Sequence, residues 1–298
     1  MHCRGAWINS MKIVSIVNHK GGVGKTTFTG CLGQALGLSG YRVLLIDNDG
    51  QHNLSSLVGT GICSPNLRDV YKAGDNEAAA TFLKSVRKTG IGNVHIVTSS
   101  SGLSEGDVKD ISYMQRCLAA CGLGRFYDFV LIDNAPGLGM LQMAAVHASN
   151  EIFVPTELRQ FAVDGLAEME KILKETYPSA PPITRIIPNF YRATKRQNTF
   201  IAALHRLFPG RVTQTAIPMD SVFDELVTEG KTLFLHRLYS KGAAYYLKIM
   251  HELFDLDERK VWETMLEKRR KRMSDEARER YFARREEARA NRERQESP

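Results

Sequence analysis

The chain has 298 residues, of which 43% are hydrophobic and 24% charged, and its formal net charge is +7 at pH 7. This length and composition suffice for a full hydrophobic core, in one large domain or two small ones. No run approaches the roughly 18 consecutive apolar residues that a membrane-spanning helix needs, which argues against an integral membrane protein. The basic excess is compatible with a polyanionic partner but does not establish one.

The cysteines are odd in number and scattered, a pattern that fits reduced thiols in a cytoplasm better than a disulfide framework. They are Cys3, Cys31, Cys63, Cys117 and Cys121. Cys117 and Cys121 share a helix face, but no second pair of cysteines or histidines accompanies them. Buried structural thiols are therefore favoured over a metal site.

Apolar runs of strand length alternate with stretches of helical spacing along most of the chain. The predicted strands are 12–18, 42–47, 93–99, 129–134, 151–156, 183–189 and 213–218. The predicted helices are 26–38, 104–121, 138–149, 161–176, 195–207 and 219–229. Strands that are apolar nearly throughout are typical of a sheet buried on both faces. The pattern predicts an α/β fold, with a mostly parallel twisted sheet and helices on both faces.

The two ends of the chain differ from this pattern. Residues 1–10 have no apolar core and no cleavage pattern, so we expect an N-terminal extension and no signal peptide, with Met11 as an alternative start. Residues 11–255 are predicted to form the globular domain. Residues 256–298 are dominated by Arg and Glu, which indicates a charged tail, either helical or partly disordered. Its basic block 268–272 (KRRKR) is an alternative candidate for a nucleic-acid or partner contact.

A glycine-rich loop follows the first predicted strand and directly precedes a helix, in the stretch NHKGGVGKTT at 18–27. Glycines let successive backbone N–H groups converge on phosphate oxygens, while a lysine and a hydroxyl serve the phosphates and Mg²⁺. Lys25 is placed to bridge the β- and γ-phosphates, and Thr26 to ligate Mg²⁺. The predicted cradle comprises Gly21, Gly22, Val23, Gly24, Lys25, Thr26 and Thr27. The loop therefore predicts a P-loop protein that binds a nucleoside triphosphate with Mg²⁺.

The standard P-loop pattern has glycine where this chain has His19, and Lys20 adds a second lysine before the glycines. The resulting pattern, KGGxGKTT, resembles the deviant Walker A motif of the ParA/MinD family, most of all its ParA-type (Soj-like) partition ATPases. Further blocks resemble family segments in the same order: VLLIDNDGQHNLSS, YDFVLIDNAPGLG, IPMDSVFDELVTEGK and LYSKGAAYYLKIMHELF. Two departures stand out: Gly50 replaces the usual proline and is expected to loosen its loop, and Met219 replaces an arginine near the nucleotide.

Carboxylates at strand ends complete the predicted catalytic set. Asp133 ends the apolar strand 129–134, where a Walker B carboxylate orders Mg²⁺ through water. The resemblance implies that Asp49 orients the attacking water, a role suited to a carboxylate, and that Asp47 supports Mg²⁺. Alternatively, Asp133 is a turn former and Asp47 or Asp49 is a helix cap.

The resemblance also implies an adenine site in the loops after the sixth and last strands, with Asn189, Ile217, Pro218, Met219 and Asp220. Asn and Pro are ordinary turn residues at such positions as well. It further implies that Lys20 reaches the γ-phosphate of a facing protomer, in an ATP-sandwich homodimer. The alternative for Lys20 is a solvated lysine at a strand end.

The function that the resemblance implies is a cytoplasmic, nucleoid-associated partition ATPase that is weak alone and stimulated by a ParB-like partner. Candidate contacts to non-specific DNA are Arg192, Lys195, Arg196, Arg206, Arg211, Arg237 and Lys241. The alternatives are a MinD-type membrane-cycling ATPase, a switch that positions a protein cargo, and a regulator that uses ATP only to dimerise. An iron–sulfur reductase is disfavoured because no cysteine follows Cys121.

Overall fold

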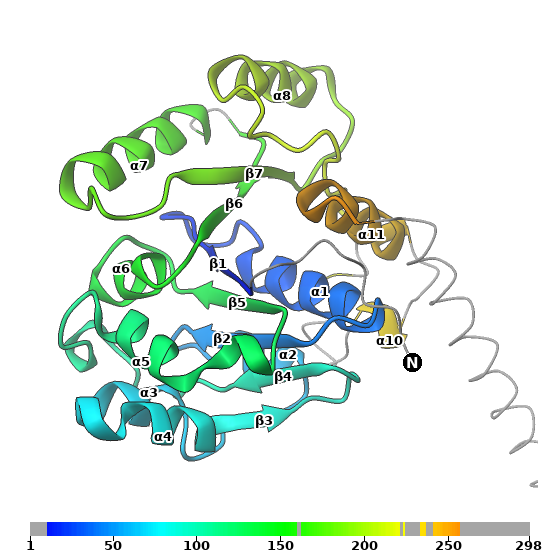
Figure 1. The fold of residues 1–298 in the computed structure, drawn as a ribbon. Helices are drawn as coiled ribbons and strands as arrows, with labels where there is room; N and C mark the ends of the chain where they lie inside the picture. The colour runs from blue at the N-terminus through cyan, green and yellow to red at the C-terminus, as the bar shows by residue number, and fades with distance from the viewer. Residues whose placement is uncertain (1–10, 160–161, 221–222, 224–232, 237–240, 257–298) are drawn as a thin grey trace, which may run out of the picture. The chain divides into compact units, whose positions relative to one another are not determined.

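The computed structural model describes residues 11–159, 162–220, 223, 233–236 and 241–256. The described residues form one α/β unit around a seven-stranded sheet (Figure 1). The predicted N-terminal extension (1–10) and charged tail (256–298) lie outside this part, apart from Leu256, so the predicted boundaries remain predictions. None of the helices in the described part is both long enough and apolar enough to span a bilayer.

The sheet has the strand order β3-β4-β2-β5-β1-β6-β7. Its strands are β1 (Lys12–Ile16), β2 (Val43–Asn48), β3 (Val86–Lys88), β4 (Val94–Val97), β5 (Phe129–Asn134), β6 (Glu151–Glu157) and β7 (Ile183–Asn189). All neighbours pair in parallel except β3 and β4. Because β1, β2 and β5 are adjacent and parallel, the loops that follow their carboxyl ends meet at one edge of the sheet.

Helices cover both faces, as the sequence predicted. The longer ones are α1 (Lys25–Leu38), α4 (Asp75–Ser85), α5 (Tyr113–Cys121), α6 (Met140–His147), α7 (Ala162–Thr176), α8 (Lys195–Leu207) and α11 (Lys241–Phe254). The shorter ones are α2 (Asn53–Leu57), α3 (Leu67–Lys72), α10 (Leu233–His236), and the 3-10 turns η1 (Glu105–Asp107) and η2 (Leu123–Arg125).

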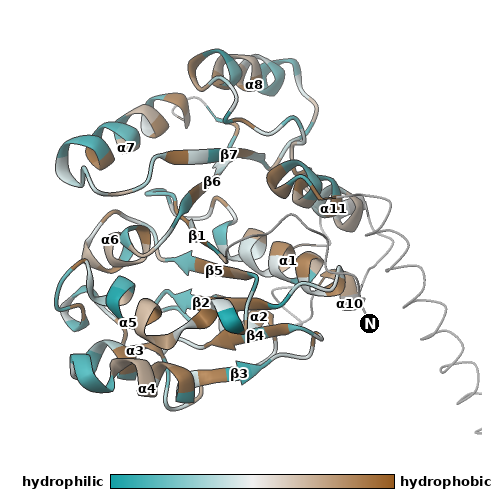
Figure 2. Cartoon of the chain, in the orientation of Figure 1, coloured by the Kyte–Doolittle hydropathy of each residue, from teal (hydrophilic) through white to brown (hydrophobic). Residues whose placement is uncertain are grey.

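Alternate residues of a strand point to opposite faces of the sheet, so the two sets pack against different helices. Leu44 and Ile46 of β2 belong to a core cluster with residues of α3, α4, α5 and α6. The other face of the sheet meets α1 and α11: Gly33 of α1 lies against Leu45, and the rings of Phe129 and Phe254 are 4.7 Å apart. Both faces of the central strands are therefore buried, which accounts for their continuous apolar sequences (Figure 2).

A second core cluster lies between β6, β7 and the helices α7 and α8. It includes Val154, Leu166, Ile186, Leu204 and Phe208. Leu204 is the buried residue of α8, whereas most of that helix is exposed. The helix is therefore held by one apolar stripe and presents its polar side to solvent.

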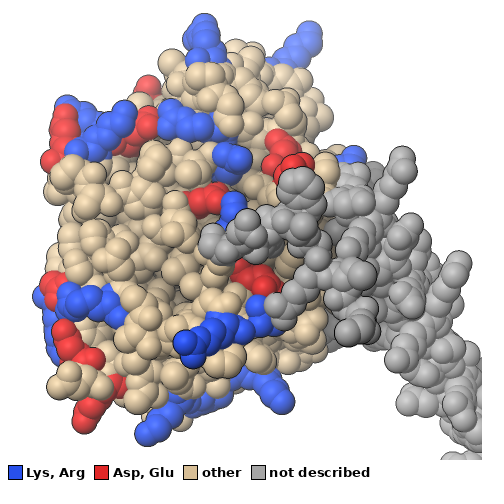
Figure 3. Space-filling model, viewed as in Figure 1, with Lys and Arg blue, Asp and Glu red and all other residues tan. Residues whose placement is uncertain are grey.

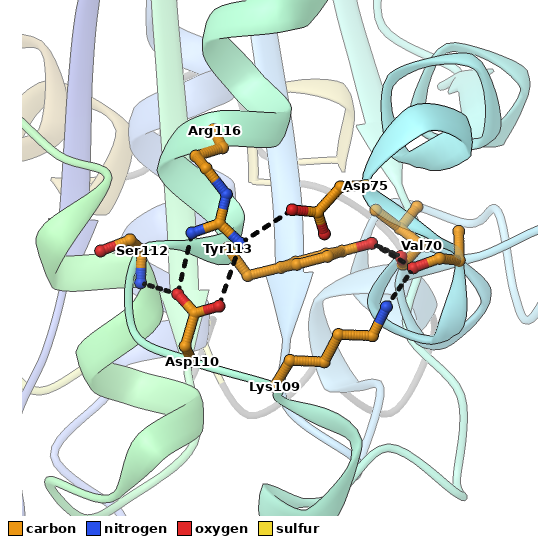
Figure 4. Close-up of polar contacts among 8 residues, drawn as sticks. Val70, Asp75, Lys109, Asp110, Ser112, Tyr113 and Arg116 are labelled. Atoms are coloured by element: carbon orange, nitrogen blue, oxygen red, sulfur yellow. Dashed lines mark hydrogen bonds and ion pairs between the residues drawn. The ribbon is translucent and has the colours of Figure 1, made fainter.

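A cluster of polar contacts, here called the α5 clasp (Asp75, Lys109, Asp110, Tyr113 and Arg116), joins α5 to the ends of α3 and α4 (Figure 4). The Tyr113 hydroxyl lies 2.6 Å from the Val70 carbonyl oxygen and 2.8 Å from that of Ala73. Arg116 pairs with Asp75 at 3.2 Å and Asp110 at 3.0 Å. Lys109 and Arg116 also lie over the Tyr113 ring. Each charged group of the clasp thus has a partner.

Two sequence predictions need correction. The stretch 213–218 is no strand and makes a single isolated bridge, between Pro218 and Tyr191, because its backbone N–H groups at Gln214 and Thr215 donate to the carboxylate of Glu252. The predicted helix 104–121 is η1 and α5 separated by a loop, in which Asp110 accepts a hydrogen bond from the Ser112 N–H. The elements β3, α2, α3 and α4 were not predicted, and the predicted helix 219–229 falls largely outside the described residues.

Candidate functional site

The glycine-rich loop lies between β1 and α1, at the edge where the central strands end. Gly24 caps α1 with φ +87°, a left-handed conformation that glycine adopts readily. A Cβ atom on Gly24 would lie 2.4 Å from Nδ2 of Asn189, so the position also lacks room for a side chain. The N-terminus of α1 thus opens onto exposed glycines, which is the geometry of an anion cradle.

Two asparagines hold this loop from both sides. Asn18 donates from Nδ2 to the Pro155 carbonyl oxygen at 2.9 Å and accepts from the Lys20 N–H at 3.0 Å. Asn189, at the end of β7, donates to the Val23 carbonyl oxygen at 2.8 Å. The role of Asn18 was not predicted from the sequence; its place at the junction of strand and glycine-rich loop was the available signal.

The two lysines of the loop point to different places. Lys25 is buried, and its Nζ lies 3.3 Å from the carbonyl oxygens of both Asn18 and Lys20, inside the loop. Burial lowers the pKa of Lys25, which the charges of Asp133 and Asp49 partly offset. The side chain of Lys20 is instead 53% exposed and pairs with Glu157 at 3.3 Å. Lys20 and Glu157 line a surface pocket of about 660 Å³ beside α7 and α8.

Asp133 and Asp47 lie in register on neighbouring strands, deep in the site. Asp133 is 1% exposed; the Thr29 hydroxyl donates to its Oδ1 at 3.3 Å, while Oδ2 has no hydrogen-bond partner. Burial and the charge of Asp47 raise the pKa of Asp133 to about 8, against the effect of the Thr26 hydroxyl. Burial likewise raises the pKa of Asp47 to about 6.

Asp47 also keeps one oxygen without a partner. Its Oδ2 accepts hydrogen bonds from the Ser55 N–H at 2.8 Å and the Ser55 hydroxyl at 2.6 Å, whereas Oδ1 has no partner. Two buried carboxylates with an unpaired oxygen each, beside the Thr26 hydroxyl, fit a Mg²⁺ ion that takes oxygen ligands and retains several waters. The described residues hold no cluster of three or more His, Cys, Asp or Glu side chains, so phosphate and water would complete such a shell.

Asp49 follows β2 and is partly exposed, with its Oδ1 accepting from the Gln51 N–H at 2.9 Å. The next residue, Gly50, packs against backbone: a Cβ there would lie 2.6 Å from the Leu103 carbonyl oxygen. This close approach gives the departure at Gly50 a structural reason, since proline would carry ring atoms onto that carbonyl. Whether the glycine also loosens the loop stays a prediction.

Residues 134–139 follow Asp133 and border the glycine-rich loop. Asn134 lies buried between β1 and β2, accepting from Asn48 at 2.8 Å and donating to the Ile16 carbonyl oxygen at 3.2 Å. A Cβ on Gly21 would lie 3.6 Å from the Pro136 side chain. Residues 134–139 thus lie against the predicted phosphate cradle. Because this segment directly follows Asp133, the candidate Mg²⁺ carboxylate, we expect it to sense a γ-phosphate.

The predicted adenine residues come together at the end of β7. Backbone hydrogen bonds join Tyr191 to Ile217 and Met219, so the loops 189–192 and 217–220 lie side by side. The side-chain oxygen of Asn189 accepts from the Phe190 N–H, and with its bond to Val23 this amide is already engaged with the backbone. Met219 is 50% exposed, and the Arg192 guanidinium lies 2.6 Å from its sulfur. The role of these residues in binding adenine stays a prediction.

The predicted DNA contacts are spread over several environments. Lys195, Arg196 and Arg206 are exposed on α8, which has no acidic residue, and Figure 3 shows basic side chains projecting there. Arg211 instead pairs with Glu170 at 2.6 Å and is half-buried. Arg237 lies outside the described residues, as does the side chain of Lys241. The structure therefore gathers only part of the predicted set on one surface.

The parallel sheet, the glycine-capped helix and the two strand-end carboxylates define a P-loop nucleotide-binding protein. A family model described as an AAA domain matches residues 11–182. The chromosome partitioning protein ParA of Caulobacter vibrioides is 31% identical over 82% of this chain and 94% of its own length. The chromosome-partitioning ATPase Soj of Treponema pallidum is 31% identical over 83% of this chain and 98% of its own length.

A solved structure supports the same assignment. The septum site-determining protein MinD from Pyrococcus horikoshii, complexed with Mg-ADP, has a TM-score of 0.67 and 27% identity, covering 82% of this chain and 96% of that chain. The chain therefore belongs to the ParA/MinD family of P-loop ATPases. The predicted family and fold class are confirmed.

Proposed function

We propose that the chain is a ParA-type ATPase that partitions DNA, either a plasmid or a chromosome, by cycling between an ATP-bound homodimer and monomers. The observation that carries this proposal is the divergence of the two loop lysines. Lys25 is folded into the cradle, whereas Lys20 lies on the rim, half exposed and paired with Glu157. A lysine that lies outside its own cradle supports a role toward a nucleotide on a facing subunit.

Within one subunit, Lys25 and the amides of the glycine-rich loop hold the phosphates, while Thr26, Asp47 and Asp133 hold Mg²⁺ directly or through water. Mg²⁺ supplies charge neutralisation on the β- and γ-phosphates. Asp49, unlike the buried Asp47 and Asp133, is partly exposed, which suits a group that orients an attacking water. Residues 189 and 217–220 hold the adenine.

In the dimer, Lys20 leaves Glu157 and contacts the γ-phosphate on the other subunit. The ion pair that it gives up is exposed and therefore worth little, about 0–1 kcal/mol. A cation supplied in this way stabilises the charge that develops during phosphoryl transfer. Hydrolysis removes the γ-phosphate and with it the reason for dimerisation, so a ParB-like partner that stimulates hydrolysis ends the cycle.

The ATP-bound dimer binds DNA without sequence preference, and α8 supplies part of the contact. This proposal is supported by the basic residues that α8 exposes and by the absence of acidic residues from that helix. Such an ATPase works in the cytoplasm on the nucleoid. Arg211 contributes least among the described candidates, because Glu170 already neutralises it.

The test is DNA binding to a random-sequence duplex with ATP or ADP, between low and moderate salt. Binding should require ATP and weaken steeply with salt. The variant Lys195→Ala/Arg196→Ala/Arg206→Ala should flatten the slope of log K against log salt by about 0.9 for each phosphate that it no longer neutralises. The matched control removes two exposed lysines of α7, Lys171→Ala/Lys174→Ala, and should bind as the parent does.

Salt-independent binding, or binding that is equal with ADP, would reject the DNA partner. In that case ATP-dependent sedimentation with anionic vesicles would support a membrane-cycling ATPase instead. Absence of both interactions, with ATP-dependent dimerisation intact, would favour a switch that positions a protein cargo.

A further inference from the structure

The loop between β4 and α5 contacts two segments of the candidate nucleotide site. One is residues 134–139 with the N-terminus of α6, and the other is the segment that carries Asp49. Glu105 lies in this loop. Glu105 lies in η1, above the N-terminus of α6. Its Oε2 accepts a hydrogen bond from the Leu141 N–H at 2.8 Å. The first turn of α6 follows residues 134–139 directly, so this bond holds the helix end that carries the γ-phosphate sensor.

Gly139 makes room for this carboxylate. Its φ of −81° and ψ of −170° suit any residue, so backbone conformation does not require glycine there. A Cβ atom on Gly139, however, would lie 2.4 Å from Oε1 of Glu105. An alanine at position 139 would therefore push the Glu105 carboxylate aside, so the two residues form one contact.

The other side of the same loop is anchored to the segment that carries Asp49. The Leu103 carbonyl oxygen packs on Gly50, and the Ser99 N–H donates to the Ser55 hydroxyl at 3.2 Å. The Ser55 hydroxyl in turn donates to Asp47. Asp107 also stabilises this loop. Its carboxylate accepts a hydrogen bond from the Ser104 N–H at 3.0 Å and pairs with Arg68 at 3.2 Å.

We infer that Glu105 is a positioning residue for ATP hydrolysis: it sets the distance between residues 134–139 and the Asp49 segment, and so the response to the γ-phosphate. This inference rests on the proposed function, since it assumes that the γ-phosphate is read at this edge. ADP lacks that phosphate, so Glu105 distinguishes ATP from ADP without touching either nucleotide. The carboxylate acts through the Leu141 N–H and through its contact with Gly139.

The experiment measures three quantities in the full chain with Mg²⁺: the affinities for AMPPNP and for ADP, and the basal rate of ATP hydrolysis. Glu105→Ala should lower AMPPNP affinity about tenfold and kcat by about 10- to 100-fold, as expected when a reacting group is misplaced by a fraction of an ångström. ADP affinity should stay within about twofold of the parent. Glu77→Ala, which removes another exposed acid in the first turn of α4, is the matched control and should change nothing.

A double-mutant cycle tests the contact itself. Gly139→Ala should displace the Glu105 carboxylate and reproduce the effects of Glu105→Ala, so that the double variant is no worse than either single one. Glu105→Gln keeps an acceptor for the Leu141 N–H without the charge and should lie between parent and Glu105→Ala; it serves as the test if the alanine variant does not fold.

Equal losses of ADP and AMPPNP affinity, additive effects in the cycle, or parental behaviour of Glu105→Ala and Glu105→Gln would overturn the inference. These outcomes differ from failure of the proposed function. If the parent itself binds no nucleotide or hydrolyses no ATP, the proposed function fails before Glu105 is tested.

Discussion

In the α5 clasp, Arg116 pairs with Asp75 and Asp110, and the Tyr113 hydroxyl lies between two carbonyl oxygens. At the nucleotide site, by contrast, Asp47 and Asp133 are deeply buried and each keeps an oxygen without a partner. A buried polar group left unpaired costs about 1–3 kcal/mol, and more when charged. The groups of the clasp satisfy one another, whereas the unpaired oxygens of Asp47 and Asp133 are available to a ligand.

We therefore expect stability and nucleotide binding to depend on different side chains. Changes in the clasp should lower stability without changing nucleotide binding. Changes to the charged side chains of the site should lower nucleotide binding and leave stability intact, or even raise it, since nucleotide-free protein carries unsatisfied groups there.

The largest effect is expected for Lys25→Ala. Loss of a charge-assisted contact to the phosphates, worth roughly 1.5–3 kcal/mol, should weaken ATP binding by about 10- to 100-fold. The thermal midpoint of nucleotide-free protein should hardly change, because Lys25 contacts only loop carbonyls there. Titration with a fluorescent ATP analogue measures this, with Lys109→Ala of the clasp as the control of unchanged affinity.

Gly24→Ala should affect both properties. The φ of +87° strains an alanine, and its Cβ would displace Asn189 from the loop. We expect a loss of about 1–2 kcal/mol in the free energy of unfolding, and about tenfold weaker ATP binding. Denaturant unfolding with and without Mg-ATP separates the two; unchanged stability would show that the loop is not fixed as described.

The two regions should respond to pH with opposite signs. Burial raises the pKa of Asp133 to about 8, so between pH 6.5 and 8 the folded state keeps a proton that the unfolded state has released. The free energy of unfolding of Mg²⁺-free, nucleotide-free protein should therefore fall as pH rises through this window, by at most about 2 kcal/mol. Burial lowers the pKa of His95, so this residue changes the free energy of unfolding in the opposite sense, but only below its ordinary pKa of about 6.5.

Asp133→Asn should remove this slope in denaturant titrations at pH 6.5, 7 and 8, and a parental slope in that variant would contradict the assignment. In the clasp the hydrogen bond from Arg116 lowers the pKa of Asp110. The contribution of Asp110 to the free energy of unfolding is present above the pKa of its carboxyl in the unfolded state, near 4. This contribution is lost only as pH falls through the lower pKa of the folded state.

The smallest effect is expected for Tyr113→Phe. The hydroxyl is the donor shared by the Val70 and Ala73 carbonyl oxygens, so its loss should cost about 1 kcal/mol of unfolding free energy. ATP affinity should match that of the parent within error. A parallel loss of ATP affinity would mean that the clasp and the site are coupled, and the separation drawn above would fail.

Much of the fold follows from patterns that a single sequence displays. The central strands are apolar nearly throughout because both faces are buried, and α1 follows directly from the glycine-rich loop. The helices α3 and α4 were missed because they are short, with six and eleven residues, so that neither shows several turns of apolar spacing. The signal that was available is the capping box at Asn66 and Asp69, from which α3 starts. The stretch 213–218 failed because a distant side chain, Glu252, takes its backbone donors.

The positions of Gly24, Lys25 and Asp133 at one edge of the sheet could be predicted, because each lies at the end of an apolar strand or at the start of the helix that follows it; their roles stay predictions. The candidate site was not predictable where a partner far along the chain decides the role. Asn18 meets Pro155, Lys20 meets Glu157, and Gly139 meets Glu105, and no local pattern announces such pairs. The engagement of Asn189 with the loop backbone likewise appears only in three dimensions.

The most direct test of the central claim is a subunit-mixing experiment with Lys20→Ala and Asp49→Asn, each of which should be nearly inactive alone. If Lys20 acts across the dimer, a mixed dimer has one complete site: the Asp49 of one subunit and the Lys20 of the other. Equimolar mixing should then restore about a quarter of the parental ATPase rate, since half of the dimers are mixed and half of their sites are complete. A mixture no more active than its two components would show that Lys20 does not act in trans.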